Sequence, residues 1–537
     1  MHKLFALYIN ELVKMRKKIS VIILLSLIVL SGLALPGITR AFEIVSEMPL
    51  SGISGSFDDD AWMKDSAKSS LLNFESFIKK ADLEIDKIRE SKDYSDEVKQ
   101  RMIQSQEEQK AQYQDSLDVY TIAFDHEIYP DFQTNYLSET VFKVIEMKGM
   151  IRSVEAYLAE SPNEELEKQL PVARELVANY LTLLEKPDFP TYVTLESERI
   201  ELDPYMSADE KEVQKEILDV RATLQPEGDL VSNSETYHMQ SVLTQITNIK
   251  NSVNSGIDYT TMGMNSTPMN PEEKVTMAER EMIIDYRLQN DIFPTKVSHQ
   301  NRMNAIYSAY SAGLFLIMIL VVILAGSSIS QEIATGSIKS LIIAPVRRWK
   351  IFTAKLLSLI SIAFLSMLVL YVAGLLGQGI FYGFTENLPY LYVANGEIAS
   401  LPFAVYMFLY LLSSFIEVIV YLLFAFLLSV ITRNTAISVA LPLGSMFLGI
   451  SIIKPMISFI PNMEILKFIP FMHFDLVTRI FQYSNLMTGE VVYDFSILTG
   501  GARYTPPGVS FSLIYIGVLC LCMLYTAFDS FTRRDIR

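Results

Sequence analysis

Six apolar stretches decide what this chain can fold into, because each is close to the ~20 residues that a helix needs to cross the hydrocarbon core of a bilayer. They occupy residues 19–38, 305–329, 351–378, 402–432, 435–453 and 508–529. A cleaved signal peptide is the alternative for the first stretch, since the basic residues of 14–18 precede it, but no small-residue cleavage site follows. The sequence therefore predicts an α-helical polytopic membrane protein with six transmembrane helices.

Charge divides the chain into two parts of opposite sign. Residues 41–300 contain 50 acidic and 25 basic side chains, and the rest of the chain contains 11 acidic and 20 basic ones. The net charge of −16 therefore comes entirely from the acidic residues of 41–300. An acidic and less apolar segment between two spans indicates a separate domain. We predict a large, mainly helical extracellular domain at 39–304, between the first and second spans, and no nucleic-acid partner.

Lysine and arginine determine the predicted orientation, because these residues are enriched at the cytoplasmic ends of membrane helices. With the N-terminus inside, 14 of them lie at cytoplasmic ends and 6 at external ends, outside the acidic segment. Both termini are therefore predicted in the cytoplasm, with 1–18, 330–350 and 530–537 inside and 454–507 outside. The acidic segment has no cysteine, which favours a bacterial cell membrane over a eukaryotic secretory route.

Helix signals dominate the acidic segment. Ser161, Ser207 and Asn270 are each followed three residues later by glutamate, which is the pattern of a capped helix start. Apolar residues at alternating spacings of three and four predict a helix that pairs with 95–128 as a hairpin. These residues are Leu71, Phe74, Ile78, Ala81, Ile85 and Ile88. Strand signals are scarce apart from TYVTLES at 191–197.

The basic segment GSIKSLIIAPVRRWK, residues 336–350, separates the second and third apolar stretches. Ile338, Leu341 and Ile342 share one face of a short predicted helix, and Pro345 ends it. Such a helix at the cytoplasmic surface can hold the lipid boundary with one face and present the other face to a soluble partner. The alternative is an interfacial turn whose long basic side chains reach the lipid headgroups without any partner.

A wider pattern around this segment resembles the signature of the ABC-2 type transporter permeases, in which a Glu, Gly-Thr, Pro-x-x-Arg and Gly-Lys series spans the second and third membrane helices. The matching residues are Glu332, Gly336, Ser337, Pro345, Arg348, Ile351 and Lys355. Ser337 replaces the usual threonine, and Ala354 replaces the glycine before Lys355.

The resemblance implies roles for several parts of the frame. Residues 330–350 resemble a coupling segment that docks on an ATP-binding subunit, and 1–18 resembles an amphipathic connecting helix. Residues 454–507 resemble an outer segment that contains an amphipathic helix before the last span. The residues that the resemblance assigns to ATPase coupling are Glu332, Gly336, Ser337, Lys339, Pro345, Arg347, Arg348 and Lys355.

The resemblance also implies partners, since members of this family work as two permeases with two ATPases. The chain has no GxxxxGK[ST] loop to hold phosphates, so we expect ATP and Mg²⁺ on a partner chain and no cofactor or metal on this one. The expected function is that of a non-catalytic membrane subunit of an exporter. Its expected partners are an ABC ATP-binding subunit, a second permease, either an identical chain or a sister chain, and membrane lipid.

Glu417 is an acidic residue in the middle of the apolar stretch at 402–432, where a charged side chain costs ~2.5 kcal/mol or more. One interpretation is that Glu417 contacts substrate or a proton in a cavity. The other is that a protonated glutamate joins neighbouring helices by hydrogen bonds, with Ser413 or Ser414 nearby. The sequence leaves both open.

The sequence leaves alternatives open for the cargo and for the class of function. The apolar spans suit a peptide, an antibiotic or a lipid-like molecule, and an ion is also compatible with the family. The alternative to an exporter is a membrane-anchored receptor or sensor whose acidic helical domain binds an extracellular ligand or a cell-wall partner. An envelope enzyme is disfavoured, because the acidic segment contains no recognisable catalytic motif.

Overall fold

The chain folds into two compact units, which we call the membrane unit (Met1–Met48 and Ser255–Arg537) and the inserted unit (Pro49–Asn254). The computed structural model describes residues 2–47, 59–132, 135–203, 205–229, 234–259, 268–337, 346–384, 387–453, 456, 464–474, 476–489 and 507–533. Most of these residues are helical. The inserted unit is shorter than the predicted domain at 39–304, because the helix of the first apolar stretch continues to Glu47 and because residues 255–304 belong to the membrane unit.

Five helices of the membrane unit are long and apolar enough to cross a bilayer among the residues that the structure describes. They are α2 (Ile19–Glu47), α11 (Val297–Ser328) with its continuation α12 (Ser330–Ala334), α14 (Arg348–Tyr382), α15 (Phe403–Thr432) and α19 (Val509–Arg533). The predicted span at 435–453 forms α16 (Thr435–Leu448), which has 14 residues, and a π-helical turn η1 (Gly449–Ile453). A sixth crossing therefore stays a prediction.

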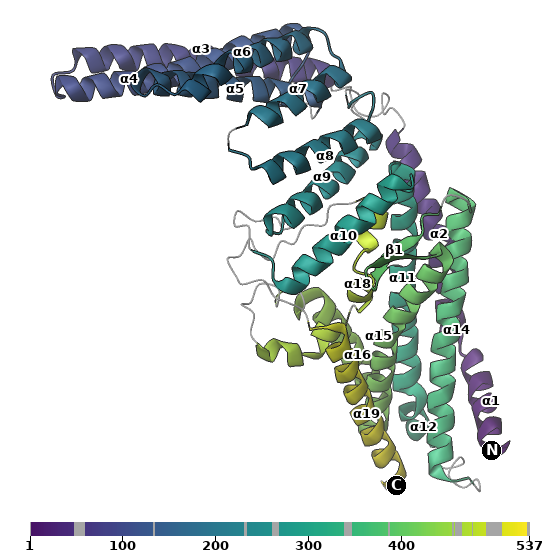
Figure 1. Ribbon diagram of the computed structural model, residues 1–537. Coiled ribbons are helices and arrows are strands. Elements are labelled where there is room, and N and C mark those ends of the chain that lie inside the picture. The colour runs from purple at the N-terminus through teal and green to yellow at the C-terminus, as the bar shows by residue number, and fades with distance from the viewer. Residues whose placement is uncertain are drawn as a thin grey trace. The chain divides into compact units, whose positions relative to one another are not determined.

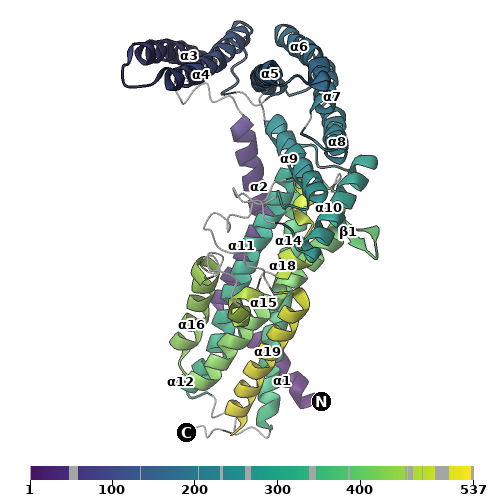
Figure 2. The same ribbon diagram turned by 60° about the vertical axis from the view of Figure 1, so that its left-hand side comes forward.

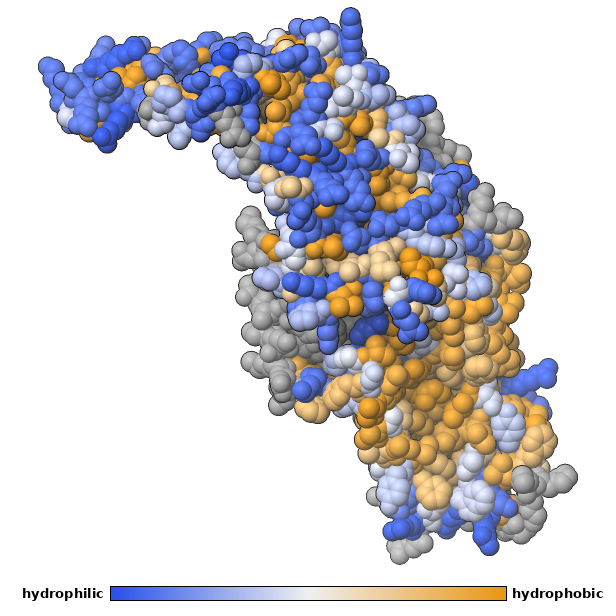
Figure 3. Space-filling view, viewed as in Figure 1, coloured by the Kyte–Doolittle hydropathy of each residue, from blue (hydrophilic) through white to orange (hydrophobic). Residues whose placement is uncertain are grey.

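Helix α11 occupies the centre of the membrane unit, where it packs against α2, α14, α15 and α16 (Figures 1 and 2). Two thirds of its apolar core is buried (67%), whereas α2 and α19 are buried over only 22% of theirs. The outward faces of α2 and α19 are thus apolar and uncovered. Figure 3 shows a broad apolar band on the visible face of this bundle, with hydrophilic residues beyond its lower end. This pattern is that of a protein whose helices face lipid.

Small residues let α2 and α14 approach closely. A Cβ atom built on Gly377 would lie 2.4 Å from the carbonyl oxygen of Gly32, and one on Gly32 would lie 2.7 Å from Ala373 Cβ. Close backbone contact between small residues commonly drives helix association in membranes, because lipid tails are as apolar as the side chains and give no hydrophobic driving force.

The two ends of the membrane unit differ in the elements that form them. Helix α1 (His2–Arg16), α12, the start of α14 and the end of α19 lie at one end, which we call the α1 end (Figures 1 and 2). Helix α10 (Pro271–Gln289) and an antiparallel hairpin of β1 (Tyr390–Ala394) and β2 (Glu397–Leu401) lie toward the other end. The hairpin turn uses Asn395 and Gly396, both at positive φ, as its two-residue loop requires.

The segment before the last span is broken into short turns. They are η2 (Glu464–Phe468), η3 (Pro470–His473), α18 (Leu476–Ile480) and η4 (Ser484–Met487). In the outer segment predicted at 454–507, the described residues of 468–481 (FIPFMHFDLVTRIF), which resemble the amphipathic helix, thus form several short helical turns.

The inserted unit is entirely helical over its described residues. Helices α3 (Asp59–Glu90) and α4 (Asp96–Asp125) pair as the predicted hairpin, with Ala81, Ile85 and Ile88 buried. The remaining helices are α5 (Tyr136–Glu160), α6 (Glu164–Glu185), α7 (Phe189–Leu202), α8 (Ala208–Leu224) and α9 (Ser234–Ser255). A core that includes Tyr136 and Tyr180 holds α4 to α7 together.

Two of the three predicted helix caps are confirmed. Ser207 and Asn270 each form a capping box with the glutamate three residues later. The prediction for Ser161 was wrong: α6 begins at Glu164, and Asn163 Oδ1 accepts a hydrogen bond of 3.3 Å from the backbone of Leu166.

The strand signal at 191–197 was also wrong, because these residues lie within α7. Asp188 caps this helix by accepting from the backbone N–H of Thr191, and Pro190 sits in its first turn, where a missing N–H costs nothing. Tyr192 and Leu195, three residues apart, then fall on the buried face. Packing on a helical core outweighs the strand preference of threonine, tyrosine and valine.

Candidate functional site

Two residues of the predicted coupling set, Glu332 and Lys355, meet at the α1 end. Glu332 lies in the short helix α12, and Lys355 lies in the second turn of α14. Lys355 Nζ is 2.8 Å from Glu332 Oε1, and both residues are buried. The fold thus brings together charges that are 23 positions apart in sequence.

Helix α1 supplies the other half of this arrangement, which we call the ion cluster (Glu11, Lys14, Glu332 and Lys355). Lys355 Nζ also binds Glu11 Oε2 at 3.0 Å, and Lys14 pairs with Glu332 Oε1. Lys18 extends the contact, donating from Nζ to Ser327 Oγ over 3.2 Å. The cluster therefore ties α1 to α12 and α14.

The roles of Glu11 and Lys14 were missed from the sequence, in which α1 was described only as an amphipathic helix. A signal was present, because Glu11, Lys14 and Lys18 recur at spacings of three and four residues and so share a face of a helix. An acid within a basic membrane-edge helix indicates a pairing partner elsewhere in the fold.

Electrostatics keep the cluster charged on its α1 side. Burial alone would lower the pKa of Lys14, but its hydrogen bond to Glu332 and the charges of Glu332 and Glu11 outweigh burial and raise it. Lys18 differs, since burial and the nearby charges of Lys14 and Lys355 lower its pKa. A buried ion is tolerated only when it is paired, so the two acids are what allow Lys355 to remain inside.

The segment that carries Glu332 is anchored by a break between α11 and α12. At Ile329 the helix interrupts, and Ser429 Oγ from α15 accepts hydrogen bonds from the backbone N–H groups of Ile329 (3.2 Å) and Ser330 (3.0 Å). Ser330 Oγ lies 3.0 Å from Thr435 Oγ1 of α16. Neighbouring serine and threonine side chains thus satisfy backbone groups that the break releases.

A hollow of about 350 Å³ opens beside the ion cluster, between α1 and the α11–α12 junction. Glu11, Lys14, Lys18, Gln331 and Glu332 are among the residues that line it. The second carboxylate oxygen of Glu332, Oε2, is buried without a hydrogen-bond partner among the described residues. Both lysines, Lys14 and Lys355, therefore bind the same oxygen of Glu332, Oε1.

The predicted residues after Glu332 end the helix. Gly336 has φ of +72°, a left-handed conformation that suits glycine at a helix C-terminus. Ser337 Oγ lies 3.0 Å from Thr335 Oγ1. Lys339 and Pro345 lie outside the described residues, so the predicted short helix between them stays a prediction.

Arg347 and Arg348 stand at the start of α14, apart from the ion cluster. Arg347 is the N-cap residue of this helix, and Arg348 Nη1 donates a hydrogen bond of 3.3 Å to the carbonyl oxygen of Thr532 in α19. A cation at the C-terminal end of a helix is favourable, because the carbonyl groups there carry partial negative charge. Arg348 thus joins the basic segment to the last membrane helix.

Glu417 lies halfway along α15 and lines a separate cavity of about 50 Å³ with His473. The hydroxyl groups of Ser413 and Ser414, which also line it, donate to carbonyl groups of their own helix, those of Leu409 and Tyr410. Such a cavity has room for a water molecule. The function of Glu417 stays open, and the two serines are near it, as one interpretation expected.

His473 is fixed on the far side of this cavity. One ring nitrogen, Nε2, is 2.6 Å from the carbonyl oxygen of Lys467, and Nδ1 is 3.0 Å from Ser512 Oγ. Burial lowers the pKa of His473 and, with the charge of Arg479, outweighs the hydrogen bond to the Lys467 carbonyl, which raises it. Over the part of the chain that the structure describes, no three histidine, cysteine or carboxylate side chains are grouped to hold a metal ion.

Comparison with known proteins points to one class of membrane protein. A family model described as "ABC-2 family transporter protein" matches residues 5–536. The chain is similar to "Uncharacterized membrane protein YdbK" of Bacillus subtilis (strain 168), with 28% identity over 134 residues, which are 25% of this chain and 50% of that protein. It is also similar to "Uncharacterized protein YhcI" of the same organism, with 24% identity over 273 residues, 50% of this chain and 78% of that protein.

Proposed function

Because this chain belongs to the ABC-2 family of transporters, we propose that it is the permease subunit of an exporter driven by a separate ATPase chain. The observation that carries the proposal is the ion cluster. Its charges lie on both sides of the basic segment at 336–350, with Glu332 before it and Lys355 after it. A movement of that segment would be transmitted to α1, α12 and α14 together, because the charges of the ion cluster pair these helices.

The α1 end is the cytoplasmic end in this proposal. Helix α1 and the end of α19 lie there together, which agrees with two termini on the same side. Lysine and arginine concentrate on the segments of this end, as they do at cytoplasmic ends of membrane helices. An ATPase in the cytoplasm would then meet the basic segment first.

Coupling works by shifting the population of two conformations. ATP binding would close the two ATPase subunits and move the basic segment, and α12 and α14 would follow because Glu332 and Lys355 bind each other. The ATPase can drive this change only through contacts that differ between the inward-open and outward-open states. Glu332 is placed to transmit such a change, since one of its carboxylate oxygens binds both Lys14 of α1 and Lys355 of α14.

The cargo class follows from the surfaces of the helices. The apolar faces of α2 and α19 are exposed in the single chain and would face lipid or a second permease, identical or sister. The cargo that an apolar interface between two permeases can accept is an amphipathic molecule that partitions into the bilayer, such as a peptide, an antibiotic or a lipid.

The proposal is tested first by identifying the partner. The full chain, purified from native membranes in mild detergent, should retain a polypeptide with a P-loop, and a lysine cross-linker should join that polypeptide to Lys350. Recovery of a sensor kinase and no ATPase would instead favour the receptor function.

Arg348→Glu then tests coupling within the complex. The reversed charge faces the carbonyl of Thr532, and losing a charged hydrogen bond of roughly 1.5–3 kcal/mol corresponds to about a tenfold loss or more. We expect ATP hydrolysis to continue while ATP-driven uptake of an amphipathic dye into inverted vesicles falls by that factor. Lys186→Glu, the same charge change on the inserted unit, is the control. Unchanged uptake in Arg348→Glu with bound ATPase would contradict the proposal.

A further inference from the structure

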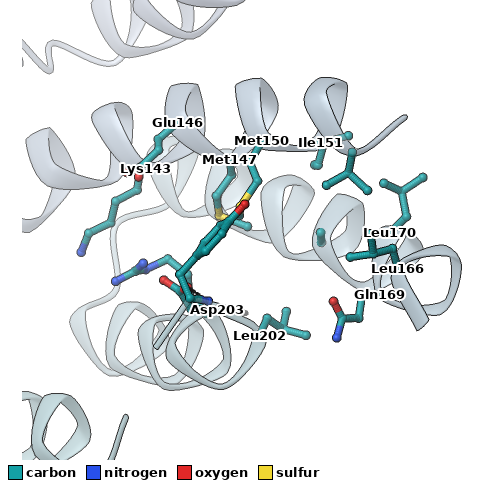
Figure 4. A pocket seen from close by; sticks show the side chains of 14 residues that line it. Lys143, Glu146, Met147, Met150, Ile151, Leu166, Gln169, Leu170, Leu202 and Asp203 are labelled. Atoms are coloured by element: carbon teal, nitrogen blue, oxygen red, sulfur yellow. Dashed lines mark hydrogen bonds between the residues drawn. The ribbon is translucent and has the colours of Figure 1, made fainter. Parts of the chain in front are cut away.

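The inserted unit contains an apolar pocket of about 180 Å³ between α5, α6 and α7. Figure 4 shows that Met147, Met150 and Ile151 of α5 approach Leu166 and Leu170 of α6 across it. Leu202, at the end of α7, also lines the pocket. Met150 is 37% exposed, so the apolar lining reaches the surface.

The size of the pocket fits one large amino-acid side chain. A cavity of about 150 Å³ lined by apolar side chains takes up a benzene ring, whereas pockets for whole drug-sized molecules measure about 300–1,000 Å³. Methionine adapts its shape to different partners, and two of the lining residues are methionines. The pocket can therefore accept leucine, phenylalanine or tryptophan from a peptide.

Exposed apolar residues continue the contact surface beyond the pocket. Tyr205, at its edge, is 88% exposed, and Tyr157 and Val172 on the lining helices are also exposed. Exposed apolar side chains beside a pocket add to its contact area, and tyrosine is enriched in interaction sites.

The surroundings of the pocket are acidic. Helices α5, α6 and α7 with Asp203 contain 13 acidic and 6 basic residues. The two basic residues of the lining, Lys143 and Arg199, are already bound by Glu196 at 2.7 Å and 3.2 Å. Glu146 and Asp203 also line the pocket, at the same side in Figure 4. A ligand there meets an apolar hole whose rim carries Glu146 and Asp203 beside two bases paired with Glu196, on helices with an excess of acid.

We propose that this pocket binds a cationic amphipathic peptide, with an apolar side chain in the hole and basic side chains on the rim. A second copy of the chain is disfavoured, because it would bring an equally acidic unit against this one. A membrane surface is disfavoured for the same reason, since anionic lipids make it negative. The proposal goes beyond the transport function, because the pocket lies in the inserted unit and needs no ATPase.

Binding is measured on the full chain in nanodiscs of zwitterionic lipid, without ATPase or nucleotide. The probe is a fluorescein-labelled helical peptide of lysine and leucine, and anisotropy reports its affinity. Two matched peptides separate the contributions: one replaces lysine by glutamate, and one replaces leucine by serine. We expect both to bind at least about tenfold more weakly than the lysine–leucine peptide, because each removes one of the two matched features.

Ala173→Leu fills the pocket from α6 and is expected to weaken the lysine–leucine peptide about tenfold. Ala178→Leu makes the same change at an exposed position of the same helix and should leave affinity unaltered. Glu146→Gln should weaken binding less, and its effect should shrink at high salt, because exposed charges are screened.

Photo-cross-linking of the peptide to the wild-type chain locates the site without any variant. Attachment to α5, α6 or Tyr205 is expected. Attachment confined to the membrane unit, equal affinity for the glutamate peptide, or dimerisation that the peptide does not displace would each overturn the proposal. Failure of peptide binding leaves the exporter proposal intact, since that proposal is tested by ATPase capture and dye uptake.

Discussion

The membrane unit and the inserted unit each contain a network of paired charges, and the two networks differ in how they are built. In the ion cluster, Lys355 is 1% exposed and reaches Glu332 and Glu11 on two other helices. In the inserted unit, Arg221 is 16% exposed. Its two terminal nitrogens bind Glu139 at 2.9 Å and 3.0 Å, and one of them also binds Asp229 at 3.1 Å. One network depends on burial, and the other on the planar fork of arginine.

This difference separates what each network can do. Removing one member of a buried pair leaves the other ion without compensation, so the ion cluster has to move as a unit or stay closed. The Arg221 network has water at one edge, since 42% of the Glu139 side chain is exposed, and its buried acid Asp229 also accepts a hydrogen bond from the backbone N–H of Tyr136, so it can lose one bond at smaller cost. The ion cluster therefore suits a mechanical connection, whereas the Arg221 network fastens α8 to α5 in a static domain.

Lys355→Met is expected to have the largest effect. It leaves Glu11 and Glu332 buried with Lys14 as their remaining partner in the cluster, and breaking a buried pair in this way costs about 3–5 kcal/mol. The measurement is the free energy of unfolding of the purified chain in detergent, followed by fluorescence of Trp349. Lys17→Met, an exposed lysine at the α1 end, is the control, because Lys350 lies over the ring of Trp349 at 5.6 Å and its replacement would alter the reporter. Equal loss in both variants would remove the distinction between buried and exposed charge.

Arg221→Met should destabilise the inserted unit by a smaller amount, roughly 1.5–3 kcal/mol, because it removes hydrogen bonds between charged groups. Trp62, which packs on Phe132 at 5.0 Å, reports unfolding of this unit. Arg101→Met removes an exposed pair with Glu97 and should change stability by only about 0.3–0.5 kcal/mol. A loss for Arg221→Met as large as that for Lys355→Met would contradict the ranking by burial.

The sequence predicted Glu332 and Lys355 through a family pattern, yet it could not show that they touch. Their contact depends on the chain returning at the start of α14, and the pairing with Glu11 depends on α1 packing along α14, 344 positions away. No local pattern encodes such a distance. The spacing of Glu11, Lys14 and Lys18 indicates a shared face, but the partner of that face is set by tertiary packing.

Local chemistry explains the other differences between expectation and structure. The dipeptide Asn395-Gly396 is one that two-residue hairpin turns favour, so the hairpin of β1 and β2 could have been predicted. The span at 435–453 has the composition of a crossing, but Pro442 lies within α16 and the helix widens to π geometry at Gly449. Composition therefore indicates where apolar surface lies more reliably than how far one helix continues.

The smallest expected effect sharpens the comparison by pH, since the Arg221 network should weaken on acidification, whereas Lys14 of the ion cluster loses its charge only at alkaline pH. Burial would raise the pKa of Glu139, but the charge and hydrogen bonds of Arg221 outweigh it and lower the pKa below its ordinary value of 4.5. The unfolded chain then binds more protons in that range, so this stabilisation is present above pH 4.5 and is lost as the pH falls through the folded value. For Lys14 the pKa is raised above 10.5, so its contribution is complete below pH 10.5 and is lost as the pH rises further.

The two tryptophans of the chain, Trp62 and Trp349, lie in different units and can report on each separately. With Trp349→Phe, the emission maximum of Trp62 should shift on acidification below pH 4.5 and stay constant to pH 10. With Trp62→Phe, the emission of Trp349 should shift above pH 10.5, where Lys14 loses its proton. A Trp62 shift in the same alkaline range, or no Trp62 shift below pH 4.5, would contradict the control of the inserted unit by the Arg221 network.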